Sequence, residues 1–476
     1  MDNKNRLAER LDGMTVALIG AGVSNMPLIP FLIGRGARVT VRDGKTEEKL
    51  GEKAGTIKSC GAALITGERY LDGLDEDVII RSPGIRPDIP EFTGAVSRGA
   101  ILTSEMELFL THTECRVFAV TGSDGKSTTT TVLSKLLETL PGGKTYLGGN
   151  IGRPLFHLYP EMGPEDKAAV ELSSFQLMTA DAPVEAAVIT NVTPNHLNWH
   201  TGMDEYIEAK KRILLHVGRA VLNFDCPVTR EIGESAGCPV TFFSRTTVPD
   251  TALRDGDSAI YLKNGEIVKR SRGGEERKFI SRSDILLPGM HNVENYMAAI
   301  AAAGEELEPE AARRVAQTFP GVEHRLEFVR EYRGVRYYNG SIDSSPTRTA
   351  AALSALSDTM PERMITVICG GYDKNIPFEP LAEAVLSNET VRAVVLTGAT
   401  AEKIRTAITS SPLWERRRDG GFLLLDGGDF DDAVGRAASV AGDGETVILS
   451  PACASFDRFE NFEERGRRFK ELVRAM

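Results

Sequence analysis

The stretch that decides the fold is Val117-Phe-Ala-Val-Thr-Gly-Ser-Asp-Gly-Lys-Ser-Thr-Thr-Thr-Thr131. Its apolar start predicts a buried strand, and the pattern that follows Lys126 predicts a helix through Leu137. Between them, Gly122 and Gly125 let backbone N–H groups approach an anion, and the helix N-terminus adds positive potential. The order of strand, phosphate loop and helix therefore predicts a nucleoside triphosphate site.

The residues of this loop are candidates for binding the nucleotide. We expect Lys126 to reach the terminal phosphates and Ser127 to offer its hydroxyl to Mg²⁺. The loop has two residues fewer than the usual Gly-x4-Gly-Lys pattern, and the alternative is a chance Gly-Lys-Ser turn on the surface. Its expected nucleotide contacts are Gly122, Ser123, Asp124, Gly125, Lys126, Ser127 and Thr128.

Length, composition and charge limit the class of protein. The 476 residues suffice for about three domains of ~150 residues each. Hydrophobic residues make up 41% and charged residues 26%, which is ordinary for a soluble globular protein. No apolar run approaches the ~20 residues of a membrane helix, no signal peptide is visible, and the six cysteines show no framework spacing. We therefore expect a cytoplasmic protein with reduced thiols and no membrane span.

The net charge of −11 argues against a general nucleic-acid binder, which would carry a basic face. It leaves anionic small substrates open, because a few local cations can override the average.

The chain alternates strand-like and helix-like patterns, which predicts the α/β class in three domains: residues 1–110, 111–318 and 319–476. In the first, predicted strands at 15–19, 38–41 and 77–81 indicate a parallel sheet with a crevice at the strand ends. Gly20-x-Gly22, with Asp43 further on, fits a dinucleotide or a nucleotide sugar equally well.

Glu171 closes one predicted strand of the second segment, and His196 follows another. Glu171 precedes Leu172-Ser-Ser-Phe-Gln176 and could complete a Mg²⁺ site with Ser127, although a solvated carboxylate is an equal alternative. The spacing of His196 and His200 would suit zinc on a helix, but no third ligand is evident, and a structural histidine is the alternative. Lys210 lies in a lysine-rich helical turn of the kind that usually faces solvent, and nothing in the sequence distinguishes it from Lys211.

With these segments in order, the chain resembles the Mur ligases, ATP-dependent amide ligases of peptidoglycan precursor synthesis, over essentially its whole length. The segments that carry the resemblance are 121–130, 171–176, His196, 209–213, 291–295 and His324-Arg325. Within the family, Ser450-Pro-Ala-Cys-Ala-Ser-Phe-Asp-Arg-Phe-Glu-Asn-Phe-Glu-Glu-Arg-Gly466 is the most selective segment. It looks like that of the members that add D-glutamate to UDP-N-acetylmuramoyl-L-alanine, as do Gly370-Gly-Tyr-Asp-Lys374 and Gly20-x-Gly-x-Ser24.

The resemblance implies Rossmann-like first and third domains, a central P-loop ATPase-type domain, and a reaction in two steps. The substrate carboxylate attacks the γ-phosphate of ATP to give an acyl phosphate and ADP. The amine of D-glutamate then attacks the activated carbonyl and expels phosphate. The two substrates would be the partners of a monomeric enzyme.

The resemblance also implies the roles of individual residues. Lys126, Glu171, His196 and Lys210 would be catalytic. Ser127 and Glu171 would hold one Mg²⁺, and His196 and Lys210 a second, with Lys210 converted to a carbamate that presents oxygens. Further nucleotide contacts would be Asn292, Asn295 and Arg325. The muramoyl-alanine end would meet Asn150, and the UDP end would meet residues in 20–25 (Gly22, Val23, Ser24, Asn25), Asp43, Ser82, Pro83 and Gly84. D-Glutamate would meet Ser344, Lys374, Ser455, Phe456 and Phe462.

One position departs from the family pattern, which often has Asn-Asp-Ser where this chain has Asn339-Gly340-Ser341. The missing acid is one that contacts the ATP ribose region, and an acid appears instead at Asp343. Because three residues of displacement need not return a carboxylate to the same point, we expect Asp343 not to replace it simply.

Other functions stay open on the sequence alone. A sister ligase could add L-alanine or a diamino acid. The related folylpolyglutamate synthetases are disfavoured by the first domain and by 450–466, and a P-loop regulatory ATPase is the alternative outside the ligases.

Overall fold

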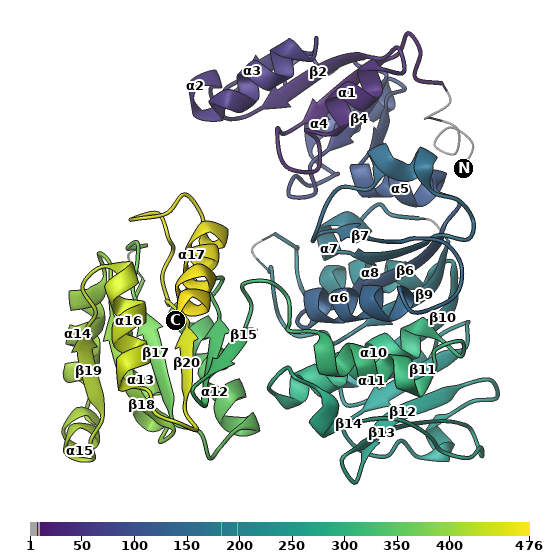
Figure 1. The fold of residues 1–476 in the computed structure, drawn as a ribbon. Coiled ribbons are helices and arrows are strands. Elements are labelled where there is room, and N and C mark those ends of the chain that lie inside the picture. The colour runs from purple at the N-terminus through teal and green to yellow at the C-terminus, as the bar shows by residue number, and fades with distance from the viewer. Residues whose placement is uncertain (1–6, 8–9, 182, 198, 375) are drawn as a thin grey trace. The chain divides into compact units, whose positions relative to one another are not determined.

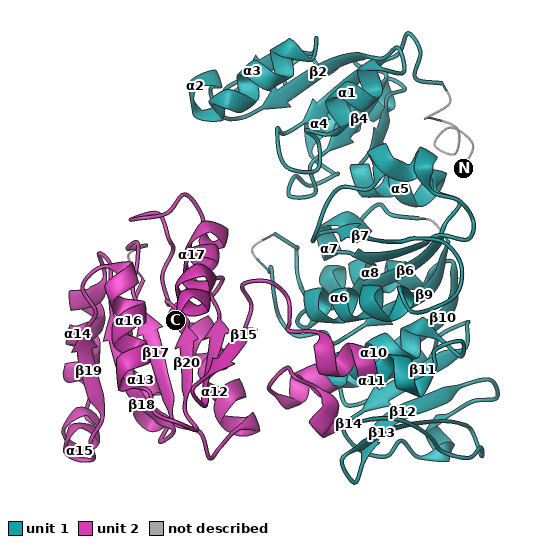
Figure 2. Cartoon of the chain, in the orientation of Figure 1, with its two compact units in different colours: residues 1–280, 294–313 teal, residues 281–293, 314–476 magenta. Residues whose placement is uncertain are grey.

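The structure is a computed structural model that describes residues 7, 10–181, 183–197, 199–374 and 376–476 (Figure 1). Its helices and strands build three sheets, and the chain divides into two compact units (Figure 2). Unit 1 comprises residues 1–280 and 294–313, and unit 2 comprises residues 281–293 and 314–476. The predicted α/β class is confirmed, whereas the division into three domains at the stated boundaries stays a prediction.

The first sheet of unit 1 has five strands in the order β3-β2-β1-β4-β5, all parallel. Because the strand order reverses at β1, a crevice opens at its carboxyl end. The strands are β1 (Thr15–Ile19), β2 (Arg38–Asp43), β3 (Ala63–Thr66), β4 (Val78–Arg81) and β5 (Ile101–Thr103). The helices are α1 (Leu28–Ile33), α2 (Glu47–Leu50), α3 (Glu52–Ser59), α4 (Pro90–Ser97) and α5 (Glu105–His112).

The second sheet of unit 1 has nine strands in the order β14-β13-β12-β11-β10-β9-β6-β8-β7. The strands are β6 (Arg116–Thr121), β7 (Thr145–Gly149), β8 (Lys167–Glu171), β9 (Val184–Ile189), β10 (Val217–Asn223), β11 (Val240–Ser244), β12 (Ser258–Lys263), β13 (Glu266–Ser271) and β14 (Arg277–Ser281). The helices are α6 (Lys126–Leu137), α7 (Ser174–Leu177), α8 (Met203–Lys211), α9 (Pro227–Glu234), and the 3-10 turns η2 (Phe156–Glu161), η3 (Arg212–Leu214) and η4 (Asp250–Ala252). Strand β6 lies between β8 and β9, so the phosphate loop begins near the middle of the sheet.

The antiparallel hairpin of β12 and β13 was not predicted. Its turn is Asn264-Gly265, with φ of 53° and 81°. This is the residue pair that a two-residue hairpin turn of type I′ prefers, because both positions need positive φ.

One hydrophobic core runs through both sheets of unit 1, since it includes Val16 and Val78 from the first sheet and Val170 and Leu222 from the second. Phe156 lies between the two: its ring stacks on Tyr159 at 5.3 Å and meets the edge of Phe31 from α1 at 5.2 Å. The two sheets therefore share a core.

Unit 2 contains a six-stranded sheet in the order β15-β16-β20-β17-β18-β19, parallel except for the β15–β16 pair. The strands are β15 (Glu327–Tyr332), β16 (Val335–Asn339), β17 (Ile365–Cys369), β18 (Val391–Leu396), β19 (Leu423–Asp426) and β20 (Thr446–Leu449). The helices are α12 (Pro346–Thr359), α13 (Glu379–Ser387), α14 (Ala401–Thr409), α15 (Trp414–Asp419), α16 (Phe430–Val440), α17 (Phe462–Ala475) and the 3-10 turn η5 (Arg282–Asp284). Helices α10 (Met290–Ala303) and α11 (Pro309–Thr318) contain the points at which the chain passes between the units.

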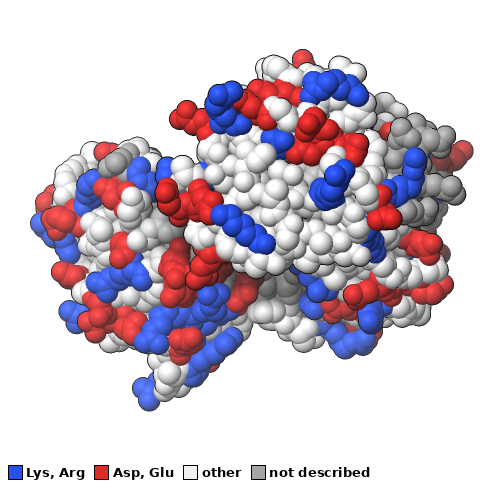
Figure 3. All heavy atoms as spheres, turned by 90° about the horizontal axis from the view of Figure 1, so that it is seen from above, with Lys and Arg blue, Asp and Glu red and all other residues white. Residues whose placement is uncertain are grey.

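Among the described residues, none of the helices is both long enough and apolar enough to cross a membrane. On the face shown in Figure 3, acidic and basic side chains are interspersed.

We predict that Phe156→Ala destabilises unit 1, because Phe156 is 1% exposed and joins the cores of its two sheets. The expected loss is roughly 3–5 kcal/mol, as for other buried aromatic truncations. The chain has two tryptophans, Trp199 in unit 1 and Trp414 in unit 2. Urea unfolding followed by fluorescence in a Trp414→Phe background therefore reports unit 1. The control is Leu215→Ala, at a side chain that is 51% exposed. Equal midpoints for the two variants would contradict the shared core.

Candidate functional site

The phosphate loop between β6 and α6 depends on two glycines. Gly122 has φ of 147° and Gly125 has φ of 79°, a region that L side chains rarely adopt. A Cβ atom at Gly122 would lie 1.9 Å from Oγ1 of Thr190, and one at Gly125 would lie 2.4 Å from Oδ1 of Asn295. Both positions therefore need glycine for space as well as for backbone conformation.

Side chains from neighbouring segments hold this loop. The Ser123 hydroxyl donates to the carbonyl of Thr193 at 2.9 Å and lies 2.9 Å from the hydroxyl of Tyr206. Thr190 donates through Oγ1 to the carbonyl of Asp124 at 2.5 Å. Asp124 itself is exposed. The loop conformation is thus set before any ligand arrives.

Two lysines bind successive carbonyl oxygens of the loop. The ammonium of Lys126 donates to the carbonyl of Ser123 at 2.8 Å, and that of Lys210 donates to the carbonyl of Gly122 at 2.7 Å. Lys210 is 1% exposed and lies 4.5 Å from the ring centre of Tyr206. Burial above all, and then the charge of Lys126, lowers the pKa of Lys210 to about 7.

The structure separates Lys210 from Lys211, which the sequence could not do. Helix α8 buries Tyr206, Ala209 and Lys210, which share one face at helical spacing. Lys211 lies on the exposed side and pairs with Glu208 at 2.7 Å.

Glu171 ends β8 and is 1% exposed. Its Oε1 accepts a hydrogen bond from Asn150 at 2.6 Å, whereas its Oε2 is buried with no hydrogen-bond partner. A buried carboxylate oxygen without a partner is unfavourable, and a cation would satisfy it. Glu171 therefore fits a Mg²⁺ ligand, and the alternative of a solvated carboxylate is wrong.

The described residues contain no group of three His, Cys, Asp or Glu side chains that could hold a metal ion alone. A Mg²⁺ ion beside Glu171 would have to draw on other hard oxygens, such as the hydroxyl of Ser127 in the first turn of α6, phosphate and water.

His196 is exposed, with φ of 55°, and its ring meets that of Phe175 at 5.0 Å. Partial burial, followed by the charges of Lys126 and Lys210, lowers the pKa of His196, so the imidazole is neutral near pH 7. His200 is instead 3% exposed and binds the Ser174 hydroxyl through Nε2 at 2.8 Å, a structural contact.

A cavity of about 310 Å³ lies at the carboxyl end of β1, where the crevice was predicted. Three predicted substrate residues, Gly22, Asp43 and Ser82, line it. Asp43 accepts the N–H of Ala21 at 2.8 Å, and a Cβ at Gly20 would lie 2.5 Å from Oγ of Ser82. The turn after β1 and the loop after β4 thus pack directly against each other.

Three lysines that the sequence reasoning missed also line this cavity: Lys45, Lys49 and Lys53. Lys45 lies in the bend after β2, Lys49 in α2 and Lys53 in α3, so no single helix face carries them, and only their clustering just after Asp43 could have identified them from the sequence. They give a small cavity a strong preference for an anion.

The other residues predicted to bind the UDP end do not line this cavity. Val23 is 74% exposed, and neither Val23, Ser24 nor Asn25 lines the cavity. The amide of Asn25 is buried and donates to the carbonyls of Ile19 and Gly20, both at 3.0 Å. The carbonyls of Pro83 and Gly84 accept bonds from Arg81 and Trp199.

In unit 2, the loops that follow β17 and β20 lie side by side, which brings together two of the predicted D-glutamate segments. The N–H of Gly370 donates to the carbonyl of Pro451 at 2.8 Å, and that of Tyr372 to the carbonyl of Ala454 at 2.9 Å. Lys374 is exposed and Ser455 is 2% exposed. Phe456 is 63% exposed and meets Tyr372 at 5.9 Å.

Arg465, which the sequence reasoning also missed, holds this region from inside. It is 2% exposed and donates to the carbonyls of Cys453 and Ala454 and to both oxygens of Ser341. The carbonyl of Phe462 accepts from the Ser341 hydroxyl at 2.8 Å, and Ser344 is half-buried.

The predicted nucleotide contacts outside the loop fall in both units. Asn295, in unit 1, accepts a hydrogen bond from Thr129 of α6 at 3.1 Å. Asn292, in unit 2, donates to the carbonyl of Pro288 at 2.6 Å, and Arg325 is exposed.

The carboxylate of Asp343 lies beside Gly340, and the expectation that Asp343 does not simply replace the missing acid at the ATP ribose stays a prediction. A Cβ at Gly340 would lie 2.6 Å from Oδ2 of Asp343 and 2.8 Å from the carbonyl of Leu449. Asp343 is 8% exposed and accepts from the Ser450 hydroxyl at 2.8 Å, and burial raises its pKa to about 7.

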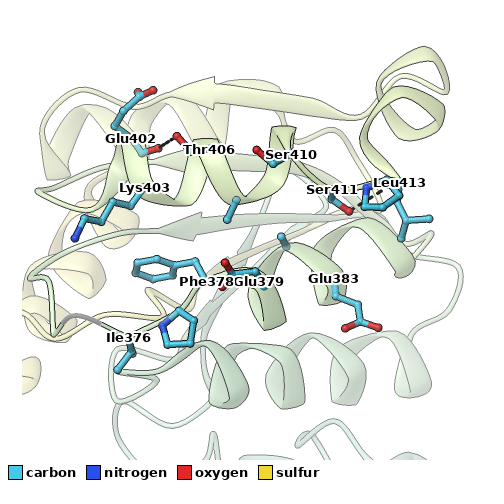
Figure 4. A pocket seen from close by; sticks show the side chains of 14 residues that line it. Ile376, Phe378, Glu379, Glu383, Glu402, Lys403, Thr406, Ser410, Ser411 and Leu413 are labelled. Carbon is cyan, nitrogen blue, oxygen red and sulfur yellow. Dashed lines mark hydrogen bonds between the residues drawn. The ribbon is translucent and has the colours of Figure 1, made fainter.

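A larger cavity, of about 850 Å³, lies in unit 2 between α13 and α14 (Figure 4). It contains none of the predicted site residues, although Lys403 on its wall pairs with Asp373, next to Lys374.

Two family descriptions match the chain: the Mur ligase middle domain over residues 120–303, and the Mur ligase, glutamate ligase domain over residues 324–453. The first match contains the phosphate loop, Glu171, His196 and Lys210, and the second contains Lys374.

Curated relatives match over nearly the full length. The UDP-N-acetylmuramoylalanine–D-glutamate ligases of Clostridium novyi and Clostridium beijerinckii are 45% and 44% identical, and the matches cover 98% and 99% of both chains. Among solved structures, the UDP-N-acetylmuramate–alanine ligase of Thermotoga maritima has a TM-score of 0.58 at 19% identity, covering 97% of this chain and 99% of that one. This chain belongs to the Mur ligase family.

Proposed function

We propose that this protein is the ATP-dependent ligase that joins D-glutamate to UDP-N-acetylmuramoyl-L-alanine through an acyl phosphate, in peptidoglycan precursor synthesis. The structural observation that supports it most is the convergence of Lys126 and Lys210 on one phosphate loop. Activation of a carboxylate by ATP and Mg²⁺ would use two features of this site: Lys210, whose pKa is about 7, and Oε2 of Glu171, which has no hydrogen-bond partner.

The central site would serve the first step. Ser127 and Glu171 would hold a Mg²⁺ ion, which when bound supplies positive charge to the transferring phosphoryl group. Lys126, released from the Ser123 carbonyl, would stabilise the charge that builds on the phosphate oxygens. Asn150, hydrogen-bonded to Glu171, would position the muramoyl-alanine carboxylate.

Lys210 would act as a carbamate. Its neutral amine would attack CO₂, forming a C–N bond and releasing a proton to solvent, so that a cation becomes an anionic oxygen donor. Because the pKa of Lys210 is about 7, much of its amine is neutral at physiological pH, whereas the amine of an ordinary lysine is almost fully protonated there. His196, neutral near pH 7, would share the second Mg²⁺ with this carbamate.

The two substrates would bind at the other sites. We assign residues 1–110 to the UDP end, with Lys45, Lys49 and Lys53 facing its diphosphate. Residues 111–318 would bind ATP, and residues 319–476 would bind D-glutamate, with Lys374 pairing a substrate carboxylate. The monomeric state and the cytoplasmic location stay predictions.

An omission assay separates this function from a sister ligase and from a regulatory ATPase. Phosphate release should require ATP, Mg²⁺, UDP-N-acetylmuramoyl-L-alanine and D-glutamate together, measured by omitting one component at a time. Release without an acceptor amine would indicate an ATPase. Preference for L-alanine or a diamino acid would indicate a sister ligase.

A further prediction concerns Lys210. Lys210→Ala should lower kcat by on the order of a hundred-fold or more, because it removes a group at the reacting phosphate. Added acetate should restore part of the activity by refilling the vacated place. At a fixed concentration of dissolved CO₂, activation by CO₂ should rise with pH through about 7, since only the neutral amine reacts.

The matched control is Lys211→Ala, one residue along the same helix but on its exposed side. Equal activity of Lys210→Ala and the unmodified enzyme, or a mass spectrum without the CO₂ adduct under conditions that preserve it, would contradict the carbamate.

The last prediction for this function concerns Lys374. Lys374→Ala should raise the KM for D-glutamate by about ten-fold or more and leave the KM for ATP nearly unchanged, because one charge-assisted contact is lost. The control is Arg436→Ala, an exposed cation on α16 of the same unit. An equal rise in the KM for ATP would remove Lys374 from the amino-acid site.

A further inference from the structure

Arg86 lies just after the loop Ser82–Ile85. Asp88 pairs with its guanidinium from the same segment at 2.7 Å, and two residues of another segment, Trp199 and Glu205, also hold it. Its Nη1 donates to the carbonyl of Trp199 at 2.8 Å, and its Nη2 donates to Oε1 of Glu205 at 2.8 Å. The guanidinium also lies 5.0 Å from the Trp199 ring centre. We call Arg86, Trp199 and Glu205 the Arg86 clamp.

The Arg86 clamp also contacts the loop that precedes Arg86. Nε1 of Trp199 donates to the carbonyl of Gly84 at 2.8 Å, and the backbone carbonyl of Trp199 accepts from Arg86, so Trp199 is joined both to the loop and to the residue that follows it. Arg86 and Glu205 have side chains that are 22% and 20% exposed, so solvent screens the pair only in part. The hydrogen bond from Arg86, together with those from Thr201, lowers the pKa of Glu205 to about 2, so the pair stays ionised at neutral pH.

The same clamp determines where His196 sits. The N–H groups of Trp199 and His200 both donate to the carbonyl of His196 at 3.0 Å, closing a turn in which His196 has φ of 55°. Phe175 fills the space between His196 and Trp199, at 5.0 and 4.3 Å from their ring centres. Moving Trp199 would therefore move His196.

A second arginine fastens the loop from inside. Arg81 is fully buried and donates through Nη1 to the carbonyls of Pro83 and Ile85, and through Nη2 to the carbonyl of Phe175 at 3.0 Å. The loop is thus joined to the segment after Glu171 by Arg81 and to the segment after His196 by Arg86.

We infer that Arg86 is a positioning residue that couples occupation of the Ser82–Gly84 loop to the placement of His196. The inference rests on the proposed function, in which this loop receives the UDP end of the substrate and His196 faces a metal ion. Arg86 itself touches neither the nucleotide loop nor a reacting atom. Binding of the UDP substrate and binding of Mg²⁺ would then strengthen each other through the clamp.

The test compares two ion pairs of unit 1. Arg86→Ala removes the clamp, and Arg116→Ala removes the pair of Arg116 with Glu185, which joins the opposite, amino ends of β6 and β9. The control pair is similarly close, at 2.6 Å, and similarly exposed, at 31% and 29%. Any general loss from deleting an ion pair should therefore appear in both variants.

We expect Arg86→Ala to raise both the KM for the UDP substrate and the Mg²⁺ concentration for half-maximal activity by about ten-fold, within the range of direct couplings. The KM for D-glutamate should stay near that of the unmodified enzyme. Arg86→Lys should raise the KM for the UDP substrate and the Mg²⁺ requirement less than Arg86→Ala does, because a lysine keeps the charge but not the forked geometry. Glu205→Ala also removes two hydrogen bonds from Thr201, so the double variant should lose more than Arg86→Ala alone but less than the sum of the two single losses, because both remove the Arg86–Glu205 pair. In the Trp414→Phe background, Arg86→Ala should also shift the emission of Trp199.

Equal KM and Mg²⁺ values in Arg86→Ala and Arg116→Ala, or independent effects of Arg86→Ala and Glu205→Ala, would overturn the inference. If the unmodified protein shows no ligation, the proposed function fails, and calorimetry then decides the coupling separately. Mg²⁺ should tighten binding of the UDP substrate in the unmodified protein and in Arg116→Ala but not in Arg86→Ala. An equal effect of Mg²⁺ in all three, or no binding of the UDP substrate, would reject the clamp as a coupling device.

Discussion

The carbonyl groups of the phosphate loop constrain the rest of the central site. The carbonyls of Gly122 and Ser123 accept hydrogen bonds from Lys210 and Lys126, so the loop turns its negative dipoles toward two cations. Gly122 and Gly125 lie so close to Thr190 and Asn295 that neither position has room for a side chain. Each of the two lysines is therefore positioned by the backbone that also shapes the anion site, and β6, α6 and α8 must keep their relative places for the site to exist.

Two ionisable groups of this site are buried, and their surroundings stabilise their charges only in part. Oε2 of Glu171 has no hydrogen-bond partner, and Lys210 lies where burial disfavours its charge. Burial of this kind costs stability unless a partner or a change of protonation offsets it. In the proposed function, a metal ion would supply the partner for Glu171, and loss of the proton would prepare Lys210 for reaction with CO₂. The unfavourable features of the site are thus the ones that the proposed chemistry would relieve.

The sequence predicted the elements that alternate regularly and the residues that follow strands. Thr15–Ile19 and Val391–Leu396 are strands with the predicted bounds, and Gly22, Asp43 and Ser82 meet in one cavity because they follow parallel strands. The choice between Lys210 and Lys211 was beyond the sequence, because it depends on which helix face packs on the loop. Arg81, Arg86 and Arg465 were missed for a related reason: each bonds to segments distant in sequence, and no local pattern marks an arginine that caps remote carbonyls.

The departure at Gly340 shows how geometry can account for a change that the sequence leaves unexplained. The backbone turns after β16 so that Asp343 returns to Gly340, and its carboxylate fills the space where a side chain at position 340 would begin. The carbonyl of Leu449, on the neighbouring strand β20, closes the same space from another side. An acid at position 340 and the present placement of Asp343 are therefore mutually exclusive on this backbone. Glycine at one position and aspartate at the other form a single structural solution, in which the carboxylate is anchored to Ser450 rather than carried by residue 340.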